Sequence, residues 1–216
     1  MVRFLGRSKR RWMSERRRDI YHINARRLGY RSRASFKLTE ICDRTGLIRP
    51  GDVVIDLGAA PGGWLQVASE RVGIGGCVLG VDLRSIESFP SPNVSTLVDD
   101  IESQDLPRMI LSRIPRKADV VLSDASSNLS GIWELDQNRQ LSLASCSDRI
   151  ASEALRPGGA MILKAFQGSS FDDLLSSLRP LFRSVDLFKP RATRKHSSEM
   201  YLVCRCFMPP AARSSA

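Results

Sequence analysis

One stretch constrains the fold of this chain more than any other: Val53-Val54-Ile55-Asp56-Leu57-Gly58-Ala59-Ala60-Pro61-Gly62-Gly63-Trp64. Its β-branched residues predict a buried strand, and the small residues and helical spacing that follow predict a tight turn into a helix. In open α/β sheets, ligands bind in the crevice at the carboxyl ends of such strands. The stretch therefore predicts an α/β fold with a ligand site at this loop.

The spacing of the glycines narrows the choice of ligand. A dinucleotide fingerprint needs three glycines, but Ala60 stands where the middle one would approach a pyrophosphate. A P-loop needs Gly-Lys, and no Lys follows a Gly in this chain. Asp82 ends the next apolar run, in the range where an acidic side chain binds ribose hydroxyls. A nucleoside without a pyrophosphate fits both facts, so S-adenosylmethionine is the predicted cofactor. The alternative is an ordinary strand-to-helix turn without a ligand.

Apolar strand patterns alternate with helical patterns along the rest of the chain. Strands are predicted at residues 53–56, 77–82, 93–98, 118–124, 160–166, 181–188 and 199–207, and helices at 12–28, 32–45, 63–72, 103–114, 137–155 and 171–178. Only about ten residues join the last two strands, too few for a parallel crossover. The pattern predicts a Rossmann-like, mostly parallel seven-stranded sheet with an antiparallel strand near the C-terminus and helices on both faces.

Three local features sharpen this prediction. Pro157-Gly158-Gly159 is expected to end a helix before a strand begins at Ala160. In the first helix, spacing places Ile20, Ile23 and Leu28 toward the core and Tyr21 outward. In the second helix, the expected buried residues are Phe36, Leu38, Ile41 and Cys42, with Lys37 beside that face but outside it.

Charge is concentrated at the N-terminus. Residues 1–33 hold eleven Arg and one Lys against two acids, whereas the remainder carries 21 basic and 21 acidic residues. A cationic arm on a neutral body is typical of nucleic-acid binding, and arginine's planar guanidinium favours RNA over lipid. A solubilising or membrane-surface tail is the alternative. We expect a basic RNA-binding segment at 1–33, a catalytic domain at 34–208 and a disordered tail at 209–216.

Length and composition exclude several classes of protein. The 216 residues suffice for one full α/β domain, and no apolar run approaches the roughly 18 residues of a membrane span. Five cysteines in no framework spacing favour a reduced cytoplasmic compartment. With only His22 and His196, no zinc cluster is expected, and we predict no metal site. We expect a monomer.

Charged residues gather at the predicted strand ends. Asp56, Asp82 and Asp124 end strands at one sheet edge, and Asp100 follows another. Lys164 lies in the otherwise apolar run Met161-Ile162-Leu163-Lys164-Ala165-Phe166, where an ammonium group is costly unless paired. It is either a structural ion-pair partner of a strand-end Asp or a lysine tuned for catalysis.

The sequence resembles the FtsJ-type (RrmJ-type) ribose 2′-O-methyltransferases of RNA. The matching segments follow the family's order over about residues 12 to 207: Arg31-Ser32-Arg33-Ala34-Ser35-Phe36-Lys37-Leu38, Asp56 to Trp64, Ser123-Asp124, Asn128-Leu129-Ser130-Gly131, Leu163-Lys164-Ala165-Phe166-Gln167-Gly168 and Ser198-Glu199-Met200-Tyr201. One departure is Ala125-Ser126-Ser127, where relatives usually have a Pro before the Asn.

The resemblance implies roles for particular residues. The family's catalytic tetrad maps onto Lys37, Asp124, Lys164 and Glu199, with Lys164 as the proton acceptor. Its S-adenosylmethionine contacts map onto Gly62, Trp64, Asp82, Asp100 and Asp124, and Asp100 is preferred to Asp99 because it precedes the apolar Ile101. As a base, Lys164 must be neutral in the reactive complex. Burial and Lys37 favour the neutral form, whereas Asp124 and Glu199 oppose it. Alternatively, both lysines mainly orient the hydroxyl and the phosphate.

The implied function is methylation of a uridine 2′-hydroxyl in large-subunit (23S-type) ribosomal RNA, either free or within the subunit. A tRNA anticodon-loop methyltransferase is the alternative within the family. Two further alternatives are a nucleotide-dependent oxidoreductase, which Ala60 disfavours, and a non-catalytic RNA-binding protein, which the complete tetrad disfavours.

Overall fold

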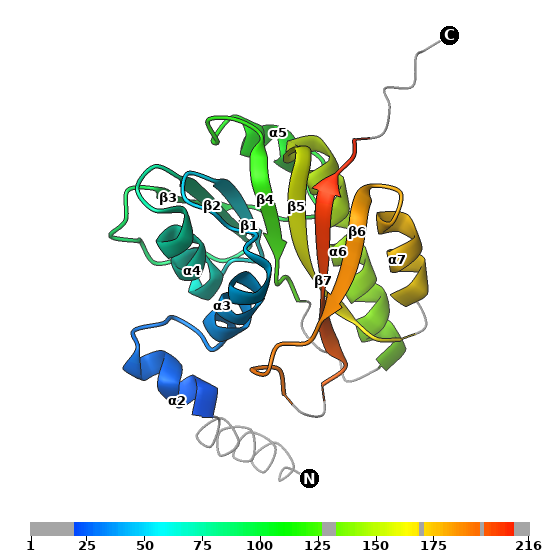
Figure 1. Ribbon diagram of the computed structural model, residues 1–216, viewed down its shortest axis with the longest axis horizontal. Coiled ribbons are helices and arrows are strands. Elements are labelled where there is room, and N and C mark those ends of the chain that lie inside the picture. The colour runs from blue at the N-terminus through cyan, green and yellow to red at the C-terminus, as the bar shows by residue number, and fades with distance from the viewer. Residues whose placement is uncertain (1–19, 127–132, 169–170, 195–196, 210–216) are drawn as a thin grey trace, which may run out of the picture.

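The structure, a computed structural model, describes residues 20–126, 133–168, 171–194 and 197–209 (Figure 1). Seven strands form one sheet: β1 (Val53–Leu57), β2 (Cys77–Asp82), β3 (Val94–Val98), β4 (Ala118–Ser123), β5 (Leu155–Phe166), β6 (Phe182–Phe188) and β7 (Glu199–Phe207). The described helices are α2 (Ile20–Arg27), α3 (Ala34–Thr45), α4 (Gly63–Val72), α5 (Leu106–Leu111), α6 (Trp133–Ala154) and α7 (Phe171–Leu178).

The strand order is β3-β2-β1-β4-β5-β7-β6. The first five strands in space pair in parallel, whereas β7 runs antiparallel to both β5 and β6. This confirms the predicted Rossmann-like sheet with an antiparallel strand near the C-terminus. Because β1 and β4 are neighbours although β2 and β3 intervene in sequence, the order reverses beside β1, which is where ligands bind in such sheets.

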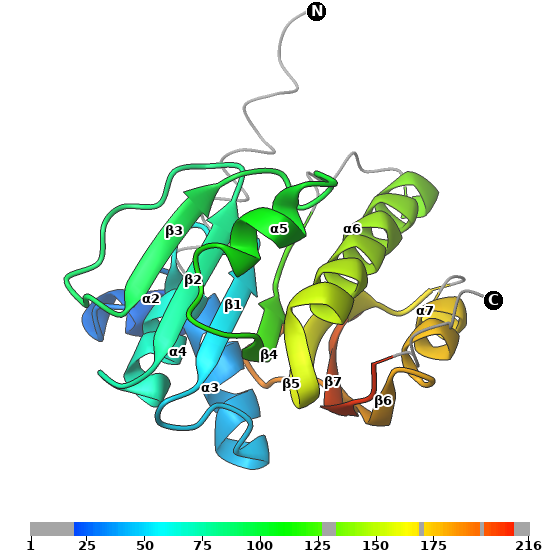
Figure 2. The ribbon, with the colours of Figure 1, turned by 90° about the horizontal axis from the view of Figure 1, so that it is seen from above.

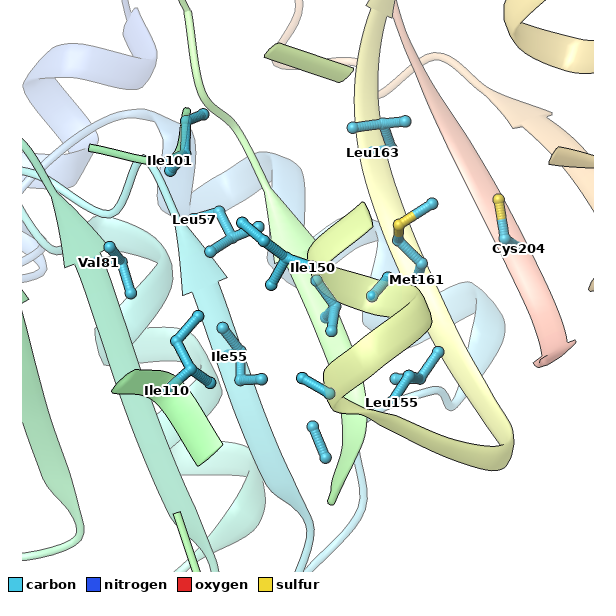
Figure 3. Packing of buried hydrophobic residues seen from close by; sticks show 14 of the residues in the cluster. Ile55, Leu57, Val81, Ile101, Ile110, Ile150, Leu155, Met161, Leu163 and Cys204 are labelled. Carbon is cyan, nitrogen blue, oxygen red and sulfur yellow. The ribbon is translucent and has the colours of Figure 1, made fainter. Parts of the chain in front are cut away.

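Helices cover both faces of the sheet, as predicted (Figure 2). On one face α5, α6 and α7 contribute Ile110, Ile150 and Leu178 to the larger core, part of which Figure 3 shows. On the other face α3 and α4 contribute Ile41 and Leu65 to a second core. Strand β1 supplies both cores, because its side chains alternate between the faces. In the part of the chain that the structure describes, no helix combines the length and apolar composition of a membrane span.

The prediction that Pro157-Gly158-Gly159 separates a helix from a strand is wrong in detail. Strand β5 begins at Leu155 and runs through these residues, with a register shift against β4 between Ala118 and Val120. At this shift, Arg156 Nε donates a hydrogen bond of 2.6 Å to Asp119 Oδ1 on the neighbouring strand, a contact between segments distant in sequence. Two helix boundaries also differ: α5 is shorter than predicted, and α6 begins four residues earlier.

The predicted faces of the first two helices also need correction. Ile20, Ile23 and Leu28 are 64%, 52% and 59% exposed. The contacts toward α3 come instead from Tyr21, whose ring centroid lies 5.7 Å from that of Phe36. In α3, Leu38, Ile41 and Cys42 are buried as predicted and Phe36 only partly. Lys37 is 8% exposed and belongs to the buried face, since a partner described below compensates its charge.

Candidate active site

A cavity of about 870 Å³ opens at the carboxyl ends of the parallel strands, beside the glycine loop. It is large enough for a nucleoside-sized ligand. Its lining combines carboxylates, arginines, one lysine and apolar side chains, among them Arg33, Trp64, Asp82, Leu83, Arg84, Asp99, Asp100, Ile101, Asp124, Arg139, Leu143 and Lys164. The predicted strand-end residues Asp82, Asp100, Asp124 and Lys164 thus share one cavity.

The glycine loop packs tightly against its surroundings. A Cβ on Gly58 would lie 2.5 Å from Ala125 Cα, and the residue has a φ of +74° that favours glycine. The backbone N–H groups of Gly58 and Ala59 both donate to Val81 O, at 2.8 and 3.1 Å. Small residues are therefore required here because the loop is pressed against β2 and the segment after β4.

Asp82 is oriented by backbone groups. Its Oδ2 accepts from Ala60 N at 2.9 Å and its Oδ1 from Arg84 N at 2.9 Å, and the residue is 8% exposed. Oδ1 also accepts from Arg84 Nε at 3.3 Å, so the carboxylate is held at the cavity with acceptor capacity left on Oδ2. Asp100 is exposed, and its Oδ1 accepts from Glu102 N at 2.9 Å.

Of two other residues predicted to bind the cofactor, one lines the cavity and the other does not. Trp64 lines the cavity, and its indole Nε1 donates to Ala34 O at 2.8 Å. Gly62 is absent from the lining and stands at the start of α4 with a φ of +105°. Asp99 lines the cavity beside Asp100, and Asp100 N donates to its Oδ1 at 2.7 Å.

Lys164 is paired with Asp124. Its Nζ lies 3.2 Å from both Asp124 Oδ1 and the Asp124 backbone oxygen, and the lysine side chain is only 8% exposed. Asp124 follows the end of β4, and β5 is the next strand, so parallel pairing brings the two groups together. The ion pair with a strand-end Asp that the sequence suggested is present.

Lys37 is paired with Glu199. Its Nζ lies 2.6 Å from Glu199 Oε1, and the two side chains are 10% and 12% exposed. Lys37 projects from α3 onto the sheet face that carries the second core, and Glu199 is the first residue of β7. The four predicted catalytic residues form two ion pairs, of which Lys164 and Asp124 line the cavity, whereas Lys37 and Glu199 do not.

Tyr201 joins the two ion pairs, and sequence reasoning assigned it no role. It stands opposite Lys164 in the antiparallel pair of β5 and β7, so both side chains lie on one face of the sheet. Its hydroxyl donates to Asp124 Oδ1 at 2.8 Å, lies 3.3 Å from Glu199 Oε1 and accepts from Lys37 Nζ at 3.2 Å. The available signal was its position two residues after Glu199, because alternate strand residues share a face.

Burial and charge set the protonation of the linking groups. Burial and the carboxylates of Asp124 and Glu199 raise the pKa of Tyr201 well above its ordinary value, so the phenol keeps its proton and donates it. Burial alone would raise the pKa of Asp124. The positive charges of Lys164 and Lys37, with the Tyr201 hydrogen bond, outweigh it and lower that pKa. Asp124 is therefore a carboxylate at neutral pH.

Asp56 lies outside this network. It is fully buried, and neither carboxyl oxygen has a hydrogen-bond partner. Burial, followed by the nearby charges of Asp124 and Asp82, raises the pKa of Asp56 well above its ordinary value. Asp56 lies inside β1, one residue before its end, and does not line the cavity, unlike Asp82, Asp100 and Asp124.

Some predicted segments lie outside the described residues. These are the first part of the basic arm, residues 1–19, the segment Asn128-Leu129-Ser130-Gly131 and the tail from residue 210. Within the described ranges, the site joins a cavity able to hold a nucleoside with a neutral cluster of two lysines, two carboxylates and a tyrosine. Such a cluster can orient a hydroxyl and move its proton.

Comparison with known proteins agrees with this geometry. The family model for FtsJ-like methyltransferases matches residues 30–207. The chain is 41% identical over 204 residues to ribosomal RNA large subunit methyltransferase E of Methanocaldococcus jannaschii, covering 93% of this chain and 83% of that protein. It is 42% identical over 205 residues to the protein of the same name from Methanobrevibacter smithii, covering 95% and 98%.

A solved structure shows the same fold. A ribosomal RNA methyltransferase of Plasmodium falciparum superposes with a TM-score of 0.74 at 26% identity, covering 84% of this chain and 100% of the other. The family match spans most of the chain, and the two relatives are matched over 83% and 98% of their own lengths. This chain therefore belongs to the family of FtsJ-like methyltransferases.

Proposed function

We propose that this protein is an RNA ribose 2′-O-methyltransferase that uses S-adenosylmethionine and acts on large-subunit ribosomal RNA. The observation that carries the proposal is the placement of Lys164 and Asp124 in the wall of the nucleoside-sized cavity, where Tyr201 links them to Lys37 and Glu199. The relatives above, named for large-subunit ribosomal RNA, support this substrate over the tRNA alternative.

The chemistry of the cavity fits S-adenosylmethionine. Carboxylates of Asp82 and Asp100 are available for hydroxyl and amino groups, and Leu83 and Ile101 offer apolar surface for a base. Gly62, Trp64 and Asp124 complete the proposed binding set. Bound there, the cofactor supplies a methyl group already activated on a sulfonium, so the residues need only position the acceptor and take its proton.

Each member of the catalytic tetrad has a proposed task. Lys164 releases its own proton to solvent as the reactive complex forms, and its neutral Nζ then accepts the proton of the ribose 2′-hydroxyl as the hydroxyl oxygen attacks the methyl group. Asp124 holds Lys164 at 3.2 Å and Glu199 holds Lys37 at 2.6 Å, and Lys37 steers the nucleoside and its phosphate. Tyr201 connects the two ion pairs through its contacts with Asp124, Glu199 and Lys37.

The test of these roles is Lys164→Ala, with methyl transfer to ribosomal RNA and S-adenosylmethionine binding measured separately. We expect transfer to fall by roughly 10²–10⁴-fold, the contribution of a positioned acid or base. The matched control is Lys117→Ala, an exposed lysine just before β4, at the opposite end of that strand from Asp124. Transfer by Lys164→Ala near the parental rate contradicts the assignment.

The RNA partner is proposed to bind the basic segment of residues 1–33. Deleting residues 1–18 is expected to weaken RNA binding and flatten its salt dependence while leaving cofactor affinity unchanged. An unchanged salt slope contradicts this part of the proposal. Mapping the 2′-O-methylated nucleotide lost from cells lacking the protein separates ribosomal RNA from tRNA. Monomeric state and cytoplasmic location remain predictions.

A further inference from the structure

Arg31 belongs to the basic segment of residues 1–33, and its guanidinium contacts other parts of the protein. Its guanidinium donates to two backbone oxygens of the segment between β2 and β3, Glu87 O at 2.6 Å and Ser88 O at 2.7 Å. It also stacks on the ring of Phe89, with Cζ 3.7 Å from the ring centroid. A third, longer contact reaches Pro61 O at 3.4 Å, in the glycine loop.

The other end of Arg31 is anchored on α4. Its backbone N–H donates to Gln66 Oε1 at 2.7 Å, and Gln66 Nε2 donates to Gly29 O at 3.0 Å. The side-chain amide of Gln66 thus forms hydrogen bonds to the backbone on both sides of residue 30. Arg31 therefore spans from the helix after the glycine loop to the segment after β2, across the outside of the loop.

The glycine loop packs closely against Arg31 and Phe89. A Cβ on Gly62 would lie 2.8 Å from Phe89 Cζ and 3.1 Å from Arg31 Cδ. The cavity is lined by Pro61 and Gly63, whereas Arg31 is absent from the lining. Arg31 and Phe89 consequently form the outer wall of the loop whose inner side faces the ligand.

We propose that Arg31 is a positioning residue that, with Phe89, holds the glycine loop in its ligand-binding shape and takes no direct part in RNA binding. Arginine suits this task because its planar fork can donate to two carbonyl oxygens while its face stacks on an aromatic ring. The proposal rests on the proposed function, since it assigns the loop to S-adenosylmethionine. It also removes one charge from those that residues 1–33 offer to RNA.

The test compares Arg31→Ala, Arg31→Lys and Phe89→Ala with Arg27→Ala, an exposed arginine at the end of α2. Amide hydrogen exchange of residues 58–63 and 83–93 is measured in the protein without ligand, and S-adenosylmethionine affinity by calorimetry. Arg31→Ala and Phe89→Ala are both expected to speed exchange in these two segments and to weaken affinity by about tenfold, the equivalent of one or two lost hydrogen bonds. Arg31→Lys is expected to resemble Arg31→Ala in exchange and affinity, because lysine keeps the charge but lacks the planar guanidinium that donates to two oxygens.

RNA binding separates the proposal from its main competitor. The salt slope of RNA affinity is expected to be unchanged in Arg31→Ala and Phe89→Ala and reduced by about one in Arg27→Ala. A reduced slope in Arg31→Ala, full rescue by Arg31→Lys or unchanged exchange in both segments overturns the proposal. If the parental protein itself fails to bind S-adenosylmethionine, the proposed function fails instead, and the exchange measurement still decides whether Arg31 holds the loop.

Discussion

The buried pair of Lys37 and Glu199 makes a quantitative prediction about the charge cluster. The two side chains are 10% and 12% exposed, and Nζ lies 2.6 Å from Oε1. Glu199→Gln leaves the Lys37 ammonium without its carboxylate, and Lys37→Met leaves the carboxylate without its cation. Removing one partner of a buried pair costs roughly 3–5 kcal/mol, so each single variant is expected to lose about 3 kcal/mol of unfolding free energy.

The double variant distinguishes pairing from simple packing loss. In Lys37→Met/Glu199→Gln neither charge is left alone, so the loss is expected to fall short of the sum of the single losses by about 2 kcal/mol or more. The assay is urea unfolding of all four proteins at neutral pH and moderate salt. A double-mutant cycle that is additive within about 0.5 kcal/mol refutes the reasoning.

A second ion pair in the same protein serves as the control. Arg71 and Asp43 also form a pair, but their side chains are 33% and 58% exposed. Water screens such surface charges, and their coupling is expected to stay below about 1 kcal/mol. A cycle on this pair therefore calibrates how much of the Lys37 and Glu199 coupling comes from burial.

Three further predictions concern single residues. Burial raises the pKa of Asp148 to about 6, so ionisation of this carboxyl group destabilises the fold as pH rises through 6. Asp148→Asn should therefore raise the unfolding free energy at pH 7 by up to about 3 kcal/mol and leave it unchanged below about pH 4, as measured by urea unfolding at both pH values. Gly58→Ala should lower the melting temperature and S-adenosylmethionine affinity, and Ala125→Gly should fail to rescue it because the clash is with backbone atoms. Tyr201→Phe should lower the unfolding free energy by about 1–3 kcal/mol. It should also move the acid limb of the pH profile of methyl transfer to higher pH, because the Tyr201 hydrogen bond lowers the pKa of Asp124. An acid limb that does not move contradicts that link.

Much of the fold could be predicted from local pattern. Strand alternation, the glycine loop and the short connection between residues 188 and 199 depend on neighbours in sequence, so they predicted seven strands and an antiparallel end. Lys164 was identified as unusual because a cation inside an apolar strand needs a partner. The chain alone also indicated a strand-end Asp as that partner, since parallel strands end at one edge of a sheet.

Other features depended on contacts between distant segments. The burial of Lys37 depends on its ion pair with Glu199, and the early start of β5 accompanies a bond from Arg156 to Asp119 on the neighbouring strand. The exposure of Ile20 likewise depends on which side of α2 meets α3, a choice that helical spacing leaves open.

The site shows the same division between sequence and tertiary structure. The sequence by itself determined the residue types, the glycine loop and the strand ends, because these depend on local periodicity and on turn geometry. Only the tertiary structure decided that β7 inserts between β5 and β6 and brings Tyr201 opposite Lys164. That insertion links the two ion pairs, and it depends on pairing between strands whose register no local pattern specifies.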